Sequence, residues 1–418
     1  MKKIYRHRIK CLQETVKKAL EEQNKYISDS NYEDKKSYLE NLKANLENLQ
    51  KSINRFIEIM DGKDKPHIGV FGCPSRGKST LLNVLLGVEI LPVGTKAGTT
   101  KYGTKLDYSD TEGFTVAVSK KNAIDIPVEP FKNYEDVNNR LRFLSNSENK
   151  QNDPDINEIT VEGPFMSFIG NDIVFVDTPG VELGASKEDL SKDGIIVEES
   201  FIGDRERAMA ILSKVDIVIY CMTVSYPERM DKELYKEIIK DKFEPINVIT
   251  GCDEREDNET NEYFIKDFTE AYELVKDQTV VVSSSKALEI IKKAKEEKKD
   301  LVKLDFEKEA LKNARKDRNV RKSKNKLKII SENLKGFNEL REKLRARIGD
   351  KSPAFCNMMI FRFERRYEYI KKDADKKEIW IPDIKGPSKI RKFFKGFFIG
   401  LGILLIVMIV LIMCFGIT

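Results

Sequence analysis

The chain has 418 residues, of which 40% are hydrophobic and 34% are charged, and its formal net charge is +5. This length allows two or three structural units, and the hydrophobic fraction is ample for a large core, so a globular protein is expected. Six scattered cysteines without a CxxC pair, together with only two histidines, argue against a disulfide framework or a zinc site. The polar N-terminus lacks the apolar core of a secretory signal, so the body of the chain is expected in the cytosol.

The spacing of apolar residues within 1–61 predicts a helical hairpin with a turn at Asp29 to Asn31. Apolar residues recur at alternating three- and four-residue steps, which is the spacing of one helix face. In the first segment they are Ile9, Leu12, Val16 and Ala19, and in the second they are Leu39, Leu42, Leu46, Leu49, Ile53, Phe56 and Met60. Because the second run is only about three heptads long, packing within the chain is favoured over a free coiled-coil dimer.

After Lys65 the pattern changes to short β-branched runs separated by helical stretches. Such alternation predicts an α/β fold with a mostly parallel sheet covered on both faces. The polar stretch Ser145 to Asp155 is predicted to be an exposed loop within this domain. The predicted strands are His67 to Phe71, Ile173 to Val176, Asp216 to Met222, Ile246 to Thr250 and Thr279 to Val282.

The first of these strands is followed by Gly72-Cys73-Pro74-Ser75-Arg76-Gly77-Lys78-Ser79 and then by the helical stretch from Thr80 to Leu86. This is the P-loop pattern GxxxxGK[ST] in the strand-to-helix context that the motif requires. Gly72 and Gly77 let the backbone N–H groups turn toward a phosphate, and Lys78 is expected to reach the β- and γ-phosphates. Ser79 is expected to be a ligand of Mg²⁺, and Thr80 lies beside it in the first helical turn.

A second phosphate motif, Asp177-Thr178-Pro179-Gly180, ends the strand that starts at Ile173. Asp177 is expected near Mg²⁺, and the N–H of Gly180 is expected near the γ-phosphate. Thr100 lies 21 residues after Ser79 and is the favoured third metal ligand, carried on a loop that orders around the triphosphate.

Base selection is expected at the ends of the later strands. There Thr250 and Asp253 form a Thr-Gly-Cys-Asp sequence, and the carboxylate of Asp253 suits the N1 and exocyclic amine of guanine. Ser284 and Lys286 belong to a Ser-Ser-Lys sequence that resembles the SAK element backing the base. Gly251 replaces the lysine of the usual [NT]KxD motif, so GTP is favoured over ATP mainly by the retained carboxylate.

The region from 290 to 330 is predicted to be helical and basic. Between Lys312 and Lys328 nine lysines and arginines face one acid, Asp317. This run is compatible with a solvated helix, with contact to anionic lipid, or with RNA binding. No DNA partner is expected. A further helix is predicted near Ala354 to Lys377.

Residues 396–417 contain no charge and read GFFIGLGILLIVMIVLIMCFGI. As a helix these 22 residues would span roughly 33 Å, about the thickness of a hydrocarbon core. Five basic residues precede the segment: Lys385, Lys389, Arg391, Lys392 and Lys395. Basic flanks stay on the cytoplasmic side, so a single-pass tail anchor in a lipid bilayer is expected, with the nucleotide-binding domain cytoplasmic.

Together these motifs resemble the dynamin superfamily of GTPases, and the stretch from Gly72 to Thr100 is similar to bacterial dynamin-like proteins and mitofusins. The 77-residue separation of Thr100 and Asp177 fits that resemblance. It implies an organisation of a neck hairpin (1–61), a G domain (62–348), a further neck helix with a linker (349–384) and a transmembrane anchor (396–417).

The resemblance also implies a GTPase that uses GTP, GDP and Mg²⁺ and is stimulated when two G domains pair, in a homo-oligomer or with a second dynamin-like protein. Lys78, Thr100, Ser75 and Arg76 are then the candidate catalytic residues; Val181 stands where Ras-like enzymes carry a glutamine. The expected function is GTP-driven tethering, fusion or remodelling of membranes. The alternative is a membrane-tethered GTP-dependent switch or scaffold that binds a partner without remodelling lipid.

Overall fold

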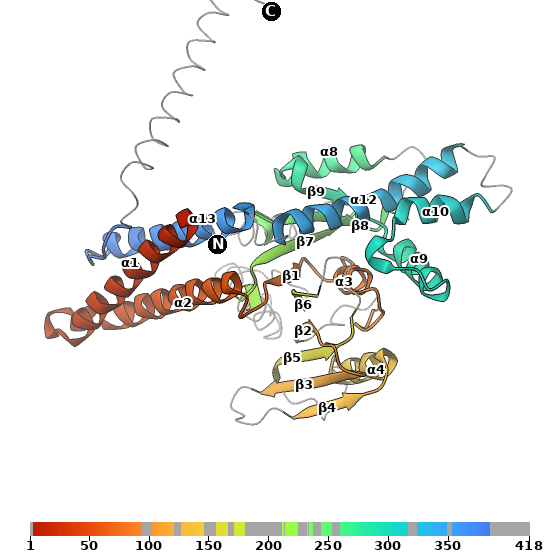
Figure 1. Ribbon diagram of the computed structural model, residues 1–418. Helices are drawn as coiled ribbons and strands as arrows, with labels where there is room; N and C mark the ends of the chain where they lie inside the picture. Colours follow the sequence, from red (N-terminus) through yellow and green to blue (C-terminus); the bar gives the residue numbers. More distant parts are fainter. Residues whose placement is uncertain are drawn as a thin grey trace, which may run out of the picture. The chain divides into compact units, whose positions relative to one another are not determined.

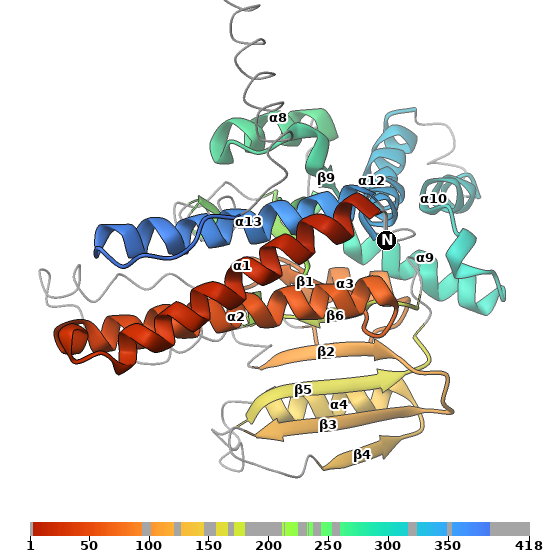
Figure 2. The same ribbon diagram turned by 60° about the vertical axis from the view of Figure 1, so that its left-hand side comes forward.

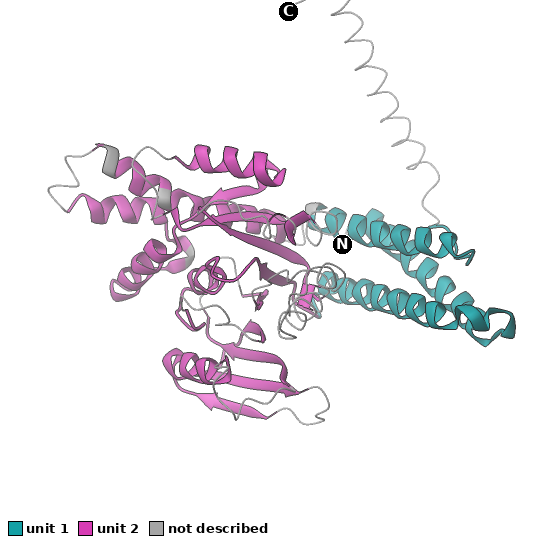
Figure 3. Ribbon diagram, turned by 180° about the vertical axis from the view of Figure 1, so that it is seen from behind, with its two compact units in different colours: residues 1–63, 353–418 teal, residues 64–352 magenta. Residues whose placement is uncertain are grey.

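The computed structural model describes residues 3–93, 102–120, 127–145, 156–165, 171–179, 211–212, 214–224, 232, 234–236, 244–252, 260–316, 324–348 and 353–384. The chain divides into two compact units (Figure 3). Unit 1 combines Met1–Lys63 with Pro353–Thr418, and unit 2 is Asp64–Ser352. These borders lie two and four residues beyond the domain borders expected after residues 61 and 348.

Unit 1 contains three long helices that pack side by side (Figure 1). Helices α1 (Lys3–Ser28) and α2 (Lys36–Asp61) are joined by the short 3₁₀ helix η1 (Ser30–Lys35), and α13 (Pro353–Lys376) contacts both. The predicted apolar stripes are the surfaces that meet, because Leu12, Val16 and Leu46 are completely buried. Three amphipathic helices thus bury a common apolar core, although α13 is far from α1 and α2 in sequence.

Polar contacts lie mainly at the rim of this bundle. One guanidinium nitrogen of Arg8 donates to both carboxylate oxygens of Glu364, at 2.9 and 2.8 Å, and thereby joins α1 to α13. The hydroxyl of Tyr38 on α2 donates to Asp373 Oδ2 at 2.9 Å. Gln23 is different: it is 0% exposed, and within the described residues neither its Nε2 nor its Oε1 has a hydrogen-bond partner.

After α13 the chain reverses at Glu378, whose φ of 59° is left-handed, and residues 379–384 run back along the helix. We call residues 379–384 the return segment. Tyr367 Oη donates to the carbonyl of Pro382 at 2.6 Å, and Lys371 Nζ donates to that of Ile381 at 2.9 Å. Ile381 is fully buried. The return segment is therefore fixed to α13 by both apolar burial and hydrogen bonds.

Unit 2 is built on a nine-stranded sheet in the order β4-β3-β5-β2-β6-β1-β7-β8-β9. In chain order the strands are β1 (His67–Phe71), β2 (Gly103–Tyr108), β3 (Phe114–Lys120), β4 (Val128–Phe131), β5 (Ile156–Gly163), β6 (Val174–Asp177), β7 (Ile217–Thr223), β8 (Ile246–Thr250) and β9 (Thr279–Val281).

The prediction of an α/β fold is confirmed, but the prediction of a mostly parallel sheet needs correction because the sheet is mixed. Strands β6, β1, β7, β8 and β9 form a parallel half. In the other half β2 is antiparallel to β6, and β3 is antiparallel to both β4 and β5. The five strands of the parallel half were predicted because their buried residues form continuous apolar runs. Strands β2 to β5 were not predicted, because each of them includes partly or fully exposed residues that interrupt such a run.

Helices cover both halves of this sheet. Helix α3 (Lys78–Leu86) contacts β1 and β6, and α4 (Tyr134–Ser145) packs on β3 and β4 (Figure 2). Helix α9 (Ser284–Glu296) contacts α3, whereas α8 (Asn261–Tyr272) and α12 (Lys324–Ile348) contact β9. Helix α10 (Phe306–Ala314) packs on α12, and the 3₁₀ turns η4 (Lys276–Gln278) and η5 (Leu301–Lys303) complete this part.

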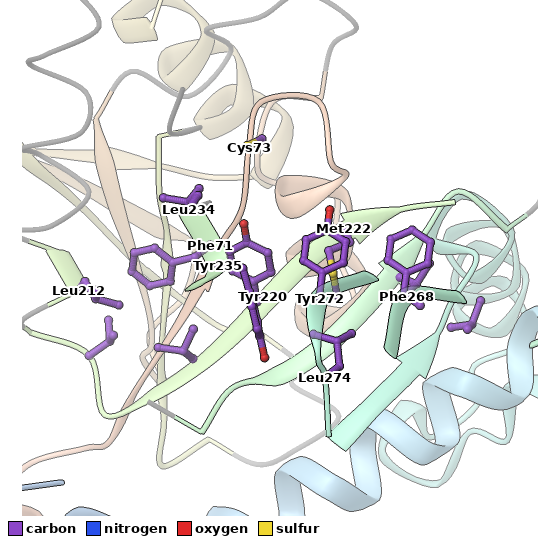
Figure 4. Close-up of a cluster of buried hydrophobic side chains, with 14 of the residues drawn as sticks. Phe71, Cys73, Leu212, Tyr220, Met222, Leu234, Tyr235, Phe268, Tyr272 and Leu274 are labelled. Carbon is purple, nitrogen blue, oxygen red and sulfur yellow. The ribbon is translucent and has the colours of Figure 1, made fainter. Parts of the chain in front are cut away.

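A buried aromatic cluster stabilises the parallel half of the sheet (Figure 4). The rings of Tyr220 and Tyr235 meet edge to face at 5.0 Å, and those of Phe268 and Tyr272 stack at 5.7 Å. Such pairs add stabilisation beyond the apolar area that they bury. The cluster also contains Cys73, so the core continues directly beneath the loop that follows β1.

The structure describes two of the predicted segments only in part and a third not at all. Ser145 ends α4, and the rest of the predicted loop to Asp155 lies outside the described residues. The basic run contributes the end of α10 and the start of α12, with 317–323 outside the description. The apolar segment 396–417 also lies outside it; among the described helices, none has the length and apolar character needed to span a bilayer.

Candidate nucleotide-binding site

The residues predicted to hold a triphosphate lie where β1 ends and α3 begins. The loop from Gly72 to Gly77 leaves the sheet next to β6 and β7, the two strands that flank β1. In an open α/β sheet, ligands bind outside the carboxyl ends of parallel strands such as these. The N-terminus of α3 faces this edge, and the N–H groups of its first turn and the helix dipole favour an anion.

The backbone of this loop has left-handed torsions at Gly72, Ser75 and Gly77, with φ of 141°, 58° and 74°. A Cβ on Gly72 would clash with the carbonyl oxygen of Cys221 on β7, so glycine is required at this position. Ser75 adopts its left-handed torsion without being glycine and is exposed at the top of the loop. Successive torsions of opposite sign turn consecutive N–H groups inward, which is the cradle that a phosphate needs.

Lys78 is 94% buried, and its ammonium group lies inside the loop. Its Nζ donates to the carbonyl oxygens of Gly72 at 3.1 Å and Cys73 at 2.8 Å. A buried cation is costly unless it is paired, and here main-chain carbonyls hold it at the place where phosphate oxygens would compete for it.

Ser79 and Asp177 meet directly, although 98 residues separate them. Ser79 Oγ donates to Asp177 Oδ2 at 2.9 Å, and Asp177 is fully buried at the end of β6. A hydroxyl and a carboxylate in contact beside a phosphate loop are the oxygen donors that Mg²⁺ uses at such sites. The residues present therefore fit a magnesium site formed by these two side chains.

Two threonine hydroxyls connect the phosphate loops to neighbouring strands. Thr250, at the end of β8, places Oγ1 3.0 Å from the carbonyl oxygens of both Arg76 and Met222. Thr178 Oγ1 donates to the carbonyl oxygen of Val70 on β1 at 2.6 Å. The hydroxyl of Thr250 thus supports the phosphate loop from below, a role that its predicted place near the base did not indicate.

Three of the expected base-binding residues, Thr250, Ser284 and Lys286, end or follow strands that finish at the same edge of the sheet. Gly251 has a φ of 77°, a torsion that a lysine would adopt only with strain, which explains the departure from the usual motif. Ser284 begins α9 directly after β9 and is 6% exposed, and its Oγ has no hydrogen-bond partner in the described part of the chain. Lys286 is exposed in the first turn of α9. Asp253 lies outside the described residues.

Asn83, which was not among the predicted site residues, connects α3 to the part of the chain that precedes Thr100. Asn83 is 0% exposed; its Nδ2 donates to the carbonyl of Leu91 at 3.0 Å, and its Oδ1 accepts from the N–H of Leu91 at 2.9 Å. This paired arrangement fixes the backbone of Leu91 relative to the P-loop helix. The available signal was one amide residue inside the apolar run LLNVLL, because a buried amide requires partners.

Helix α4 holds the same stretch of chain from the other side. Asn138 Nδ2 donates to the carbonyl oxygens of Glu89 and Ile90 at 3.3 and 3.1 Å. Glu89 also pairs with Lys292 of α9 at 3.0 Å. Burial lowers the pKa of the neighbouring Lys295 ammonium, while the carboxylates of Glu135 and Glu89 act in the opposite direction. The chain before residue 94 is therefore fixed by α3, α4 and α9 together.

The remaining predicted residues are placed as follows. Arg76 is half-buried in the P-loop, and Thr80 is half-buried in the first turn of α3. Thr100 and Gly180 lie outside the described residues, so their expected contacts with metal and phosphate stay predictions.

A parallel sheet half, a glycine-turned loop holding a buried lysine, and a serine–aspartate pair at its rim define a P-loop nucleotide-binding domain. Residues 68–252 match the Dynamin family. The matched region is 185 of the 418 residues and lies within unit 2, so unit 2 contains a domain similar to the GTPase domain of that family.

The chain has a distant curated relative. An uncharacterized protein from the xynA 3′ region of Caldicellulosiruptor sp. (strain Rt8B.4) is 26% identical over 201 residues, which are 48% of this chain and 43% of that protein. The chain thus spans less than half the length of this curated relative.

Two of the solved structures that match this chain resemble it only weakly. A bacterial dynamin pair, described as sensing and tethering membranes over long range, matches with a TM-score of 0.43 and 17% identity, over 88% of this chain and 50% of that one. Era of Aquifex aeolicus bound to GDP·AlF₄⁻ matches with a TM-score of 0.30 and 21% identity, over 55% of each chain.

Proposed function

We propose that this protein is a membrane-anchored dynamin-like GTPase that hydrolyses GTP when two G domains pair and uses the cycle to tether, fuse or remodel membranes. One observation carries the proposal: a dynamin-family G domain and an uncharged 22-residue segment with a basic flank, residues 396–417, occur on the same chain. The segment has the length and composition of a membrane span, and its flank suits a cytoplasmic orientation.

In this proposal the residues at the end of β1 bind the substrate. The loop N–H groups and the N-terminus of α3 receive the β-phosphate, and Lys78 exchanges its carbonyl partners for phosphate oxygens. Ser79 and Asp177, together with Thr100, would hold Mg²⁺, which would supply positive charge next to the phosphates. Ser75 is exposed on the loop, where a second G domain or the attacking water is accessible to it.

The proposal is tested by reconstituting the full chain in vesicles at several protein-to-lipid ratios. GTP hydrolysis per molecule should rise with surface density, because pairing of G domains is a second-order event. Vesicle clustering and lipid mixing should require GTP and should be absent with GDP. A hydrolysis rate that does not change with density would contradict activation by pairing.

The same vesicles distinguish the alternative of a membrane-tethered switch or scaffold. That protein would bind GTP and hydrolyse it slowly at every density, and it would leave clustering and lipid mixing unchanged. Comparing GTP, GDP and a non-hydrolysable analogue in one set of vesicles separates the two functions. If the G domain pairs with that of a different dynamin-like protein, then adding this second protein to the vesicles should restore GTP hydrolysis that this chain alone does not show.

A further inference from the structure

Helix α1 carries a histidine and a cysteine in contact on its outer side. The Sγ atom of Cys11 lies 3.7 Å from Nε2 of His7, which is four residues earlier on the helix. Both residues are two positions from Ile9 of the buried stripe, so each lies about 160° around the helix from it. His7 is exposed and Cys11 is half-buried. The pair is therefore accessible from outside the helix bundle.

The separation of the two atoms suits a zinc ion. Zinc binds cysteine sulfur at about 2.3 Å and histidine nitrogen at about 2.0–2.1 Å, and a tetrahedral angle then places the two ligand atoms about 3.6 Å apart. The observed distance of 3.7 Å between Cys11 Sγ and His7 Nε2 is close to this value. The i, i+4 spacing is also the one by which a helix presents two metal-binding side chains on one face.

Cys11 differs from the other cysteines in the described part of the chain. It is the one that is partly accessible to solvent, and it is the one beside an imidazole. A thiol and an imidazole together are the ligand types that zinc prefers. The remaining described cysteines are all buried: Cys73, Cys221, Cys252 and Cys356.

One copy of the chain supplies only half of a zinc site. Among the residues that the structure describes, no group of three or more histidines, cysteines or carboxylates is placed to hold a metal ion. Structural zinc sites have four ligands, and two cysteines with two histidines are a common set. A second copy related by a two-fold axis would bring the same two residues to the same ion and complete this set.

The surroundings of the pair favour a contact between copies that depends on the metal. Ile4 is 52% exposed and lies seven residues before Cys11, hence on the same side of α1, where it offers an apolar contact. Residues 1–11 include five basic residues and no acid, so two such segments repel each other. Zinc bound by two thiolates and two neutral imidazoles carries no net charge. The ion can therefore hold the copies together without adding to this repulsion.

We propose that His7 and Cys11 of two copies of this chain bind one zinc ion, in a four-ligand site that joins unit 1 of one copy to unit 1 of the other. Binding releases the thiol proton of each Cys11, because zinc binds the thiolate. The site requires neither the nucleotide nor the membrane anchor, so it does not depend on the proposed function.

Zinc titration of the full chain tests the site. The protein is purified in detergent with a reductant that does not bind zinc, and zinc is added in competition with a chromogenic chelator. Excess magnesium keeps the pair of Ser79 and Asp177 from taking up zinc. One zinc ion should bind per two chains, and light scattering should show a change from one copy to two that EDTA reverses. Cobalt in place of zinc should give the strong visible absorption of a tetrahedral site and a sulfur-to-cobalt charge-transfer band.

Single substitutions assign the ligands. Cys11→Ser and His7→Gln should each lower the zinc affinity by about 100-fold or more, at least the loss that removal of an outer-shell partner causes, and should prevent pairing. Lys18→Ala is the matched control, because Lys18 is exposed on the same side of α1 and its loss leaves both ligands in place. Lys78→Ala should bind zinc like the unchanged chain, so a failure of GTP hydrolysis and a failure of zinc binding are told apart.

Three results would overturn the inference. The first is zinc binding that survives both Cys11→Ser and His7→Gln. The second is one zinc ion per chain without pairing, because the site would then be complete within one copy. The third is pairing that needs oxidation and not zinc and that a reductant abolishes, which would assign Cys11 to a disulfide between copies.

Discussion

The two units bury polar side chains in different ways. In the part of the chain that the structure describes, unit 1 buries two polar side chains and unit 2 buries eleven. Several of those of unit 2 near the P-loop contact main-chain atoms, as Asn83 does with Leu91 and Thr250 does with Arg76. In unit 1, Thr15 bonds to a carbonyl of its own helix, and Gln23 has no partner among the described residues.

This difference follows from what each unit must position. A bundle of helices satisfies its own backbone, so apolar packing suffices and a buried amide only costs stability. A nucleotide site is made of loops, whose backbone groups need side-chain partners to keep one conformation. Removing the hydrogen-bonded polar groups beside the P-loop should therefore damage unit 2, whereas replacing Gln23 by an apolar residue should benefit unit 1.

The largest expected effect is that of Lys78→Ala, which removes the cation from the P-loop. GTP hydrolysis by the full chain in vesicles should be abolished, and triphosphate affinity should fall by about 100-fold or more, because a charge-assisted contact to phosphate is lost. Steady-state hydrolysis and titration with a fluorescent nucleotide measure the two effects. Lys303→Ala, at an exposed lysine in the same unit, should behave as the unchanged protein.

Asn83→Ala should destabilise unit 2 by about 2–4 kcal/mol, because it breaks two buried hydrogen bonds and leaves both backbone groups of Leu91 without them. Denaturant unfolding followed by hydrogen exchange in unit 2 measures the loss. Asn138→Ala removes contacts to the preceding residues from a half-buried side chain and should cost less. If the two variants lost the same free energy of unfolding, the size of the loss would not depend on how deeply the asparagine is buried.

Gln23→Leu should stabilise unit 1 by about 1–3 kcal/mol, since it replaces a buried amide without partners by an apolar side chain of similar size. Hydrogen exchange of α1 and α2 amides should slow accordingly. Leu12→Gln, which places an amide at another fully buried position of α1, should have the opposite effect. A loss of stability in Gln23→Leu would show that this amide does have a partner.

Thr250→Val preserves shape but removes the hydroxyl beneath the P-loop. We expect a loss of about 1–2 kcal/mol in the stability of unit 2 and weaker nucleotide binding, because the carbonyls of Arg76 and Met222 lose their donor. Thr269 is a matched control: its Oγ1 is buried and has no hydrogen-bond partner in the described structure. Thr269→Val should therefore be neutral or stabilising and should leave nucleotide affinity unchanged.

The smallest expected effect concerns the ion pair between Arg8 and Glu364 in unit 1. Both side chains are 26% exposed, and one guanidinium nitrogen of Arg8 meets both carboxylate oxygens of Glu364. A double-mutant cycle with Arg8→Ala and Glu364→Ala should give a coupling of about 0.5–1 kcal/mol that decreases with added salt. If the coupling energy were as large as the stability loss of Asn83→Ala, polar contacts would contribute equally to the stability of both units.

The sequence predicted the parts of the fold whose pattern is strong. The parallel strands β1, β6, β7, β8 and β9 are short apolar runs, and the helices of unit 1 follow a clear repeat. Strand β3 escaped notice because only alternate residues are buried, with Phe114, Val116 and Val118 inward and polar or small residues outward. That alternation is the signature of an antiparallel strand with one exposed face, which a search for continuous apolar runs overlooks.

The candidate site was predictable where a motif fixes the spacing. Lys78 and Ser79 follow from the P-loop pattern, and the meeting of Ser79 with Asp177 follows from the pairing of β1 with β6. The contacts of Asn83 and Thr250 could not be predicted, since they depend on which carbonyls lie within reach after folding. A motif specifies which atoms bind a ligand, but the surrounding hydrogen bonds arise from the tertiary structure.

The return segment also has a mechanical consequence. A force that pulls on residue 385 would load the bond between Tyr367 and Pro382 first, and the bond between Lys371 and Ile381 next. Because the segment runs opposite to α13, these bonds would break one after another and not together. The extra length released would lengthen the linker while the three helices remain packed, so unit 1 would yield to tension gradually before it unfolds.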